Sequence, residues 1–218
     1  MIERFQDRID AGRQLAVALK NLSPRPDIVL ALPRGGVPVG AQVAHQLQIP
    51  LQVFVVRKLG VPGHEEYAMG ALASGNVILL NHEVIQQIGL SQREVDTVIE
   101  KEKRELERRE RQYIPGSSPL QLEGRNVVLV DDGLATGSSM KAAVQAVRLQ
   151  GARSVTVAVP VAPASARWEF ETIADHYVTV MEPQRFYAVG QWYENFSQTT
   201  DEEVQAWLAR EPAGALNR

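Results

Sequence analysis

The chain has 218 residues, and its 26 acidic and 23 basic side chains give a formal net charge of −3 at pH 7. This balance excludes the basic excess that nucleic-acid-binding proteins carry, so we expect no nucleic-acid partner. The absence of cysteine excludes disulfides, thiolate metal sites and a cysteine nucleophile. The longest apolar runs are far below the ~18 residues needed to span a bilayer, so we predict a cytoplasmic protein with no membrane partner.

Short apolar runs rich in β-branched residues recur along the chain, as expected of strands covered on both faces. Helical patterns alternate with them: Val39, Val43 and Leu47 form one stripe, and a second stripe from Met140 stops before Gly151. We therefore predict an α/β fold, an open parallel sheet with helices on both faces. The predicted strands are residues 27–31, 51–56, 126–130, 155–159 and 176–180.

Two helices begin with a recognisable capping box. Ser91 with Glu94 opens a long helix, and Thr200 with Glu203 opens another near the end of the chain. Residues 100–111 of the long helix carry six basic and five acidic side chains. Because the two signs nearly cancel, we interpret this run as a solvated helix face rather than a basic binding segment.

The most informative stretch is VVLVDDGLATGSSM, residues 127–140. Its apolar strand ends at Asp131 and Asp132, and ligands of parallel α/β sheets bind beyond the carboxyl ends of the strands. Adjacent carboxylates there repel each other and need a partner such as a metal ion or sugar hydroxyls. The loop at 135–139 adds consecutive backbone N–H groups and hydroxyls at a helix N-terminus, which suit a phosphate group. We therefore predict a phosphorylated sugar as the ligand.

The sequence does not match the better-known phosphate-binding loops or the serine-hydrolase motif. Three residues separate Gly133 from Gly137, and two serines follow, whereas a Walker A loop needs four intervening residues and then Lys-Ser/Thr. Neither a G-x-G-x-x-G dinucleotide fingerprint nor a G-x-S-x-G hydrolase elbow occurs. A plain helix cap and turn would explain the serines and the glycine but not the two acids at the strand end.

The stretch VVLVDDGLATGSS resembles the phosphoribosyl pyrophosphate (PRPP) binding motif of the type I phosphoribosyltransferases. LPRGG at 32–36 resembles the pyrophosphate-binding loop of that family, and VRK at 56–58 followed by LGVPGHEEYAMG resembles its flexible loop. The order and spacing of the three elements match, so the resemblance spans most of residues 27–160. It implies the type I phosphoribosyltransferase fold and, as often in the family, a cis peptide at Pro33–Arg34.

The resemblance implies that ribose 5-phosphate is transferred from PRPP to a nucleobase or other nitrogen acceptor, or back, with pyrophosphate leaving. Mg²⁺ is the implied cofactor; Asp131 and Asp132 would hold it, directly or through water, and bind the ribose hydroxyls. Arg34, Arg57 and Lys58 would neutralise pyrophosphate, with residues 57–70 closing over the site. The other implied substrate-binding residues are Gly35, Gly36, Gly133, Leu134, Ala135, Thr136, Gly137, Ser138 and Ser139.

The acceptor is less clear than the donor. Where purine-type relatives commonly have a general-base aspartate, this chain has Ala135, whose methyl group cannot take a proton. PVAPAS, after the fourth predicted strand, also lacks the lysine of purine enzymes. The aromatic segment 185–196 resembles the hood that stacks the base in purine salvage relatives, with Phe186 as first stacking candidate and Trp192 and Tyr193 next. Alternatively, these aromatic residues pin the C-terminal segment to the sheet.

We predict one domain over residues 1–218, with a core at about 20–182 and a small C-terminal hood at about 183–210. Because the resembling family is usually dimeric, a homodimer is expected. Two other functions stay open, since a fold does not establish an activity: a non-catalytic regulatory protein that binds PRPP or a nucleotide, and a nucleotide or sugar-phosphate hydrolase on the same fold. The three basic residues expected at pyrophosphate favour the transferase over the hydrolase.

Overall fold

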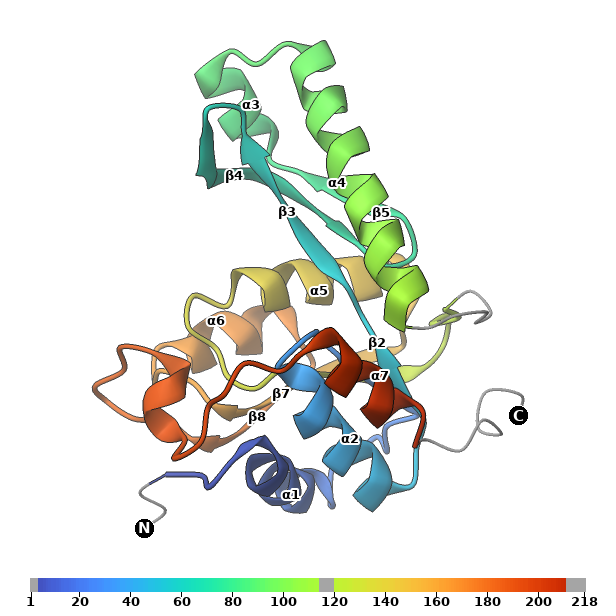
Figure 1. Cartoon of the computed structure of the whole chain (residues 1–218), viewed down its shortest axis with the longest axis vertical. Coiled ribbons are helices and arrows are strands. Elements are labelled where there is room, and N and C mark those ends of the chain that lie inside the picture. Colours follow the sequence, from blue (N-terminus) through green and yellow to red (C-terminus); the bar gives the residue numbers. More distant parts are fainter. Residues whose placement is uncertain (1–3, 114–119, 211–218) are drawn as a thin grey trace.

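The computed structural model describes residues 4–113 and 120–210 and contains two sheets (Figure 1). The strands are β1 (Ile28–Ala31), β2 (Leu51–Val53), β3 (Val56–Val61), β4 (His64–Ala73), β5 (Val77–Leu80), β6 (Asn126–Val130), β7 (Ser154–Val161) and β8 (His176–Met181). The helices are α1 (Arg8–Leu19), α2 (Gly36–Leu47), α3 (His82–Ile88), α4 (Gln92–Tyr113), α5 (Ser138–Leu149), α6 (Ala166–Ile173), α7 (Asp201–Leu208) and the short 3-10 helix η1 (Val189–Trp192). A five-stranded sheet in the order β2-β1-β6-β7-β8 is parallel throughout, and the three-stranded sheet β3-β4-β5 is antiparallel.

Four of the five predicted strands lie in the parallel sheet, as does the first half of the predicted strand 51–56, and the predicted open sheet with helices on both faces is confirmed. Successive side chains of a strand point to opposite faces. In β1, Val29 and Ala31 therefore enter the apolar cluster that includes α1 and α2. Ile28 and Leu30 enter the second cluster, which includes α5 and α6. The sheet is thus buried between two helical layers (Figure 1).

Helix α1 was not predicted, and it lies in the layer that contains α2. Asp7 caps it by accepting hydrogen bonds from the N–H groups of Ile9 and Asp10, so Arg8 is its first residue. A Cβ atom at Gly12 would lie only 2.7 Å from the carbonyl oxygen of Val39 in α2. Glycine at this position therefore allows the two helices to approach closely.

The segment after β2 corrects two expectations. The predicted strand 51–56 is divided, because β2 ends at Val53 and the next strand belongs to the other sheet. The segment 57–70, expected to be a flexible loop that closes over the site, instead belongs to the antiparallel hairpin β3–β4, and Arg57 and Lys58 lie inside β3.

The hairpin forms because its apolar residues have a partner. Leu59, Val61 and Met69 are fully buried in the same cluster as Val95 and Leu106 of α4. Burial of an aliphatic side chain of this size contributes roughly 1.5–3 kcal/mol, which favours an ordered hairpin over a loop. Because charged side chains alternate with these apolar ones, the segment looked like a polar loop in the sequence.

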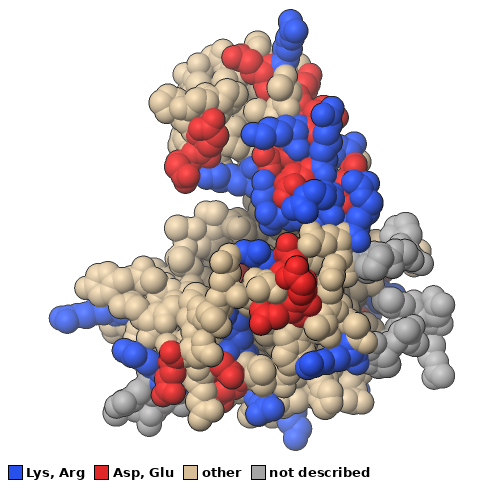
Figure 2. All heavy atoms as spheres, viewed as in Figure 1, with Lys and Arg blue, Asp and Glu red and all other residues tan. Residues whose placement is uncertain are grey.

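Helix α4 covers the hairpin with one face. The predicted solvated face is found in part: Glu100, Lys101, Arg104, Arg108 and Arg111 are exposed, whereas Glu102 turns toward the hairpin and pairs with Arg57. Its capping box is confirmed, since the N–H and hydroxyl groups of Ser91 donate to Glu94 at 2.8 and 2.7 Å. The second box, Thr200 with Glu203, begins α7. Lys and Arg side chains gather over α4, and acidic side chains of α7 lie beneath them (Figure 2).

The start of the described chain meets the C-terminal segment around Tyr193. Phe5 and Tyr193 form a parallel bridge, in which the N–H group of Phe5 donates to Trp192 and that of Glu194 donates to Phe5, each at 2.8 Å. This bridge fixes the start of α1 against the predicted hood. Along residues 4–113 and 120–210, no helix combines the length and the apolar character needed to cross a membrane.

Candidate active site

The loops that follow β1 and β6 meet at the carboxyl edge of the parallel sheet. These strands are neighbours, so LPRGG and the acidic pair leave the sheet side by side. A Cβ atom at Gly35 would overlap the Asp132 carboxylate, and one at Gly36 would lie 2.9 Å from Cα of Asp131. The two glycines therefore allow the backbone of one loop to contact the acids of the other, as their predicted common role requires.

Arg34 connects the loop after β1 to the start of α7 and, through Asp201, to the end of α4. The Pro33–Arg34 peptide is cis, as expected. The Arg34 guanidinium lies 3.8 Å from the carboxylate of Asp201 at the start of α7, and the hydroxyl of Tyr113 at the end of α4 donates to that carboxylate at 2.7 Å. This hydrogen bond is the main cause that lowers the pKa of Asp201. The acid is therefore held ionised beside the predicted pyrophosphate-binding arginine.

The two acids of the site have different partners. Oδ1 of Asp131 accepts the N–H group of Asp132 at 2.8 Å. Oδ2 of Asp132 accepts Nε of Arg8 at 2.8 Å. Nη1 of Arg8 also donates to the carbonyl oxygen of Ser197 at 2.7 Å, and its guanidinium lies 4.0 Å from the centroid of the Phe196 ring. Arg8 thus connects the start of α1, the acidic pair and the C-terminal segment.

Burial disfavours the ionised form of both acids. It raises the pKa of Asp131 well above the usual range, and the neighbouring charge of Asp132 raises that pKa further. Burial also raises the pKa of Asp132, but the charge of Arg8 and its hydrogen bond oppose this effect. The pair is therefore under electrostatic strain that a bound cation would relieve.

The loop from Thr136 to Ser139 opens α5 as predicted. Gly137 is the N-cap residue with a φ of +68°, in the left-handed region that favours glycine, and provides no side chain to cap the helix. The N–H groups of the first helical turn therefore remain available to an anion. The hydroxyl oxygens of Thr136 and Ser138 lie 3.1 Å apart beside them, and both side chains are exposed.

The predicted hood packs on the loop after β6. A Cβ atom at Gly133 would lie 2.6 Å from Val189 in η1, so the two segments are in direct contact. Tyr193 is buried, and its hydroxyl donates to the carbonyl oxygen of Asp132 at 2.5 Å. It pins the segment to the site and is not exposed to stack a ligand. Phe186 is half-buried. It packs, as does Trp192, against the apolar cluster that contains Phe5, Val161 and Tyr193.

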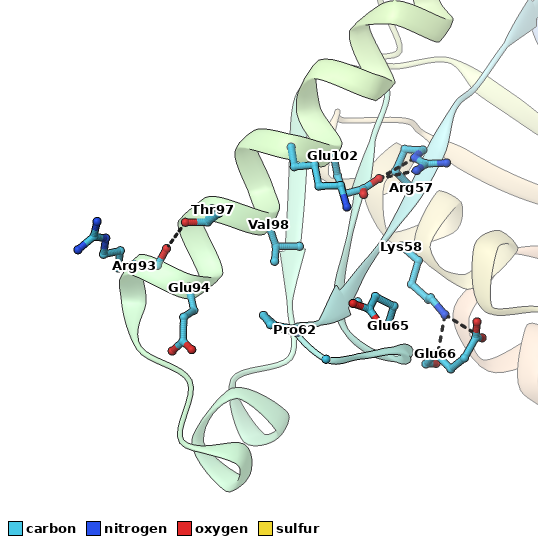
Figure 3. A pocket seen from close by; sticks show the side chains of 13 residues that line it. Arg57, Lys58, Pro62, Glu65, Glu66, Arg93, Glu94, Thr97, Val98 and Glu102 are labelled. Carbon is cyan, nitrogen blue, oxygen red and sulfur yellow. Dashed lines mark hydrogen bonds and ion pairs between the residues drawn. The ribbon is translucent and has the colours of Figure 1, made fainter.

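Arg57 and Lys58 lie on the hairpin, and their partners belong to the hairpin and to α4: Arg57 binds the Glu102 side chain, and Lys58 binds the backbone carbonyl oxygen and the carboxylate of Glu66. Arg57 points toward α4 and donates to Glu102 at 2.5 and 2.9 Å, whereas Lys58 points toward Glu66 on β4 (Figure 3). Both line a pocket of about 680 Å³ between the hairpin and α4, lined by basic and acidic residues alike. Within residues 4–113 and 120–210, no recorded hydrogen bond or ion pair joins them to the Asp131–Asp132 pair.

Three charged residues at the site were not predicted from the sequence. Lys141 lies in the first turn of α5 and pairs with Glu169 on α6 at 2.8 Å; its position just after the phosphate loop was a readable signal. Arg8 and Asp201 gave no local signal, because they come from the two ends of the chain. Arg8 is 124 residues away from Asp132 in the sequence.

The donor set suits a magnesium ion that shares its ligands with a substrate. In the described part of the chain, no group of three or more His, Cys, Asp or Glu side chains could enclose a metal ion. Mg²⁺ commonly binds through one or two carboxylates together with substrate phosphates and water. Asp131 and Asp132 therefore fit this ion if a diphosphate or sugar provides the other oxygens.

Comparisons with known proteins agree with this geometry. The model of the phosphoribosyl transferase domain matches residues 1–194. The protein named "Putative phosphoribosyl transferase Rv0571c" of Mycobacterium tuberculosis H37Rv is 48% identical over 206 residues, a match that covers 94% of this chain and 46% of that protein. This chain thus spans about half the length of the curated relative. The crystal structure of TT1426 from Thermus thermophilus is 41% identical, with a TM-score of 0.83, and the match covers 94% of this chain and 97% of that one.

Proposed function

Because the chain belongs to the phosphoribosyl transferase domain family, we propose that it is a magnesium-dependent phosphoribosyltransferase that uses PRPP. The proposed reaction transfers ribose 5-phosphate to or from a nitrogenous base, with pyrophosphate as the leaving group. One observation supports it above the others: the Arg34–Gly36 loop contacts the Asp131–Asp132 pair, and the phosphate loop of α5 follows that pair directly.

Each part of the site has a proposed role that follows from its chemistry. The first-turn N–H groups of α5, with Thr136, Ser138 and Ser139, bind the 5-phosphate. The carboxylates of Asp131 and Asp132 accept hydrogen bonds from the ribose hydroxyls. Arg34 and the backbone of the loop after β1 bind the diphosphate. In this proposal the anomeric carbon lies between the acids and the diphosphate loop.

Transfer breaks the bond between C1 of the ribose and a pyrophosphate oxygen, which keeps the electron pair. A nitrogen of the acceptor then forms the new bond to C1. Because the transition state resembles an oxocarbenium ion, the negative acids stabilise the sugar while Arg34 stabilises the departing oxygen. A magnesium ion held by Asp131 and Asp132 would neutralise part of the charge on the diphosphate.

Proton removal from the acceptor remains to be assigned. Ala135 is exposed on the loop, and its methyl group cannot act as a base. We therefore propose an acceptor whose attacking nitrogen carries no proton at neutral pH, or one that loses its proton to solvent. Phe186 is the proposed stacking residue because it is half-buried in the hood beside the site.

The proposal is tested by incubating the protein with PRPP, Mg²⁺ and a panel of bases and following pyrophosphate release. Base-dependent release is expected, and Asp132→Asn should weaken PRPP binding sharply in calorimetry. PRPP binding that Asp132→Asn leaves unchanged would place the site elsewhere. Binding of PRPP with no turnover for any base would favour a regulatory protein instead.

A second candidate function, hydrolysis with water as the acceptor, is favoured by Ala135 alone. A hydrolase needs no pocket for a base, and water is small enough to enter a site that lacks the purine-type general base. Release of pyrophosphate or ribose 5-phosphate at the same rate with and without bases is the outcome that would support it.

The assembly is a separate proposal. We propose a homodimer, as is usual for these enzymes, and light scattering of the purified chain tests it, because a mass near 24.1 kDa would indicate a monomer. A cytoplasmic location remains a prediction of the sequence.

A further inference from the structure

We propose that Arg8 is a functional residue of this site: an internal counter-ion of Asp132 that strengthens diphosphate binding and weakens the binding of a free metal ion. The proposal rests on the proposed function for its ligand, but it assigns a role to a residue outside the motifs that indicate that function. Its consequence is that magnesium enters together with the diphosphate and binds weakly by itself.

The position of Arg8 points to the diphosphate loop as well as to the acids. Its Nε lies 2.8 Å from Oδ2 of Asp132, and only 3.2 Å from where a Cβ atom of Gly35 would lie. The side chain is 11% exposed, so water screens its charge little. A nearly buried guanidinium beside the Arg34–Gly36 loop adds positive charge where the leaving diphosphate would lie.

The arginine is held from three directions. Its Nε donates a hydrogen bond to Asp132, and its Nη1 donates one to the carbonyl oxygen of Ser197. The Phe196 ring covers one face of the guanidinium. For Nη2, no hydrogen bond is recorded within residues 4–113 and 120–210. A guanidinium carries five N–H donors, so a preorganised group keeps donors for a ligand.

A purely structural reason for an arginine here is weak. Arg8 is the first residue of α1, where the partial positive charge of the helix N-terminus disfavours a cation. Capping is already provided by Asp7. The position therefore favours a cation only because Asp132 and the carbonyl of Ser197 lie beside it.

The charge balance predicts opposite effects on two ligands. The ionised acidic pair carries two negative charges, and Arg8 offsets one of them. Replacement of Arg8 by a neutral residue therefore leaves a stronger site for a free divalent cation. The same replacement removes a cation from beside the diphosphate loop and weakens anion binding.

Arg8→Met tests the proposal with two simple ligands. Mn²⁺ alone, followed by electron paramagnetic resonance, should bind about 3- to 10-fold more tightly to the variant. Metal-free pyrophosphate, followed by calorimetry at low salt, should bind about 3- to 10-fold more weakly. A folding defect would weaken both ligands, so opposite shifts distinguish the proposed role from damage to the fold.

Arg13→Met is the matched control, because Arg13 is exposed on the same helix and its loss changes the net charge equally. It should leave both affinities unchanged. Arg8→Gln keeps a hydrogen-bond donor for Asp132 without the charge, and it carries the test if Arg8→Met does not fold. Its Mn²⁺ affinity should also rise and its pyrophosphate affinity should also fall.

The outcomes separate this inference from the proposed function. If the wild-type protein releases pyrophosphate from PRPP and both Arg8 variants bind the two ligands as the wild type does, only the role of Arg8 is overturned. If the wild type binds neither pyrophosphate nor PRPP, the proposed function and the diphosphate role fail together. Mn²⁺ affinity that is unchanged or lower in Arg8→Gln overturns the counter-ion role in either case.

Discussion

The hydroxyl group of Tyr193 donates a 2.5 Å hydrogen bond to the backbone carbonyl oxygen of Asp132, which joins the hood to the second residue after the β6 strand. Burial is the main cause that raises the pKa of this hydroxyl, so it remains a donor across the neutral range. Tyr193→Phe should lower the free energy of unfolding by about 1–2 kcal/mol, because a buried carbonyl loses its partner. Urea unfolding with an unchanged m-value is the measurement.

Tyr187→Phe is the control for this variant, since Tyr187 is 81% exposed and its hydroxyl loses only water. It should leave the stability within experimental error. Equal effects of the two substitutions would mean that the Tyr193 hydroxyl does not anchor the hood.

Asp201→Asn should strengthen pyrophosphate binding. The substitution removes the carboxylate 3.8 Å from Arg34 but keeps an acceptor for the Tyr113 hydroxyl. Both side chains are partly exposed, so we expect only about a 2- to 5-fold gain at low ionic strength. Salt should reduce the gain, because it screens such pairs. Calorimetry at two salt concentrations measures it, and Glu202→Gln on the same helix is the control. Weaker binding by the variant would show that Asp201 orients Arg34 rather than competing for it.

Gly35→Ala should weaken ligand binding strongly with little loss of stability. The backbone of Gly35, with φ −61° and ψ −31°, suits any residue, so the effect comes from the overlap of the new methyl group with the Asp132 carboxylate. We expect pyrophosphate and PRPP affinity to fall by more than about 10-fold, a loss of roughly 1.4 kcal/mol or more.

Gly124→Ala is the reciprocal control for this prediction. A Cβ atom at Gly124 meets open space, but its φ of +71° strains a non-glycine residue. It should cost about 1 kcal/mol of stability and leave ligand binding intact. Normal PRPP binding by Gly35→Ala would indicate that Asp132 does not contact the ligand.

Asp131→Asn should stabilise the ligand-free protein at pH 7. Burial raises the folded-state pKa of Asp131 above its unfolded value of about 3.9. Its contribution to stability is therefore fully present below about pH 3.9 and is lost as the pH rises through the folded-state pKa. The melting temperature of the variant should exceed that of the wild type by a margin that grows from pH 4 to pH 7. A constant margin would contradict this prediction, and the variant should also bind PRPP poorly.

The sequence predicted the parallel sheet well because its strands are continuous apolar runs. Residues 126–130, for instance, are buried at every position, and few other structures accommodate such a run. The resemblance implied that LPRGG and the acidic pair bind parts of one ligand, but the direct contact between them is known only from the folded chain.

The sequence could not predict the parts that depend on distant partners. The β3–β4 hairpin has exposed charges around Leu59 and Val61, and it becomes a recognisable sheet only when α4 covers those residues. Likewise, Arg8 and Asp201 lie in ordinary helix starts, and only the folded chain brings them to Asp132 and Arg34. Local patterns carry no information about pairs of such large sequence separation.

The bridge between Phe5 and Tyr193 also has a consequence for synthesis of the chain. Because a ribosome makes these two segments at different times, the N-terminal segment that leads to Arg8 must wait for the hood before it has its partner. The nascent chain can form β1 and α2 early, but the arginine lacks two of its three contacts until Phe196 and Ser197 have been added. Full ligand affinity should therefore be reached only after the hood has been translated.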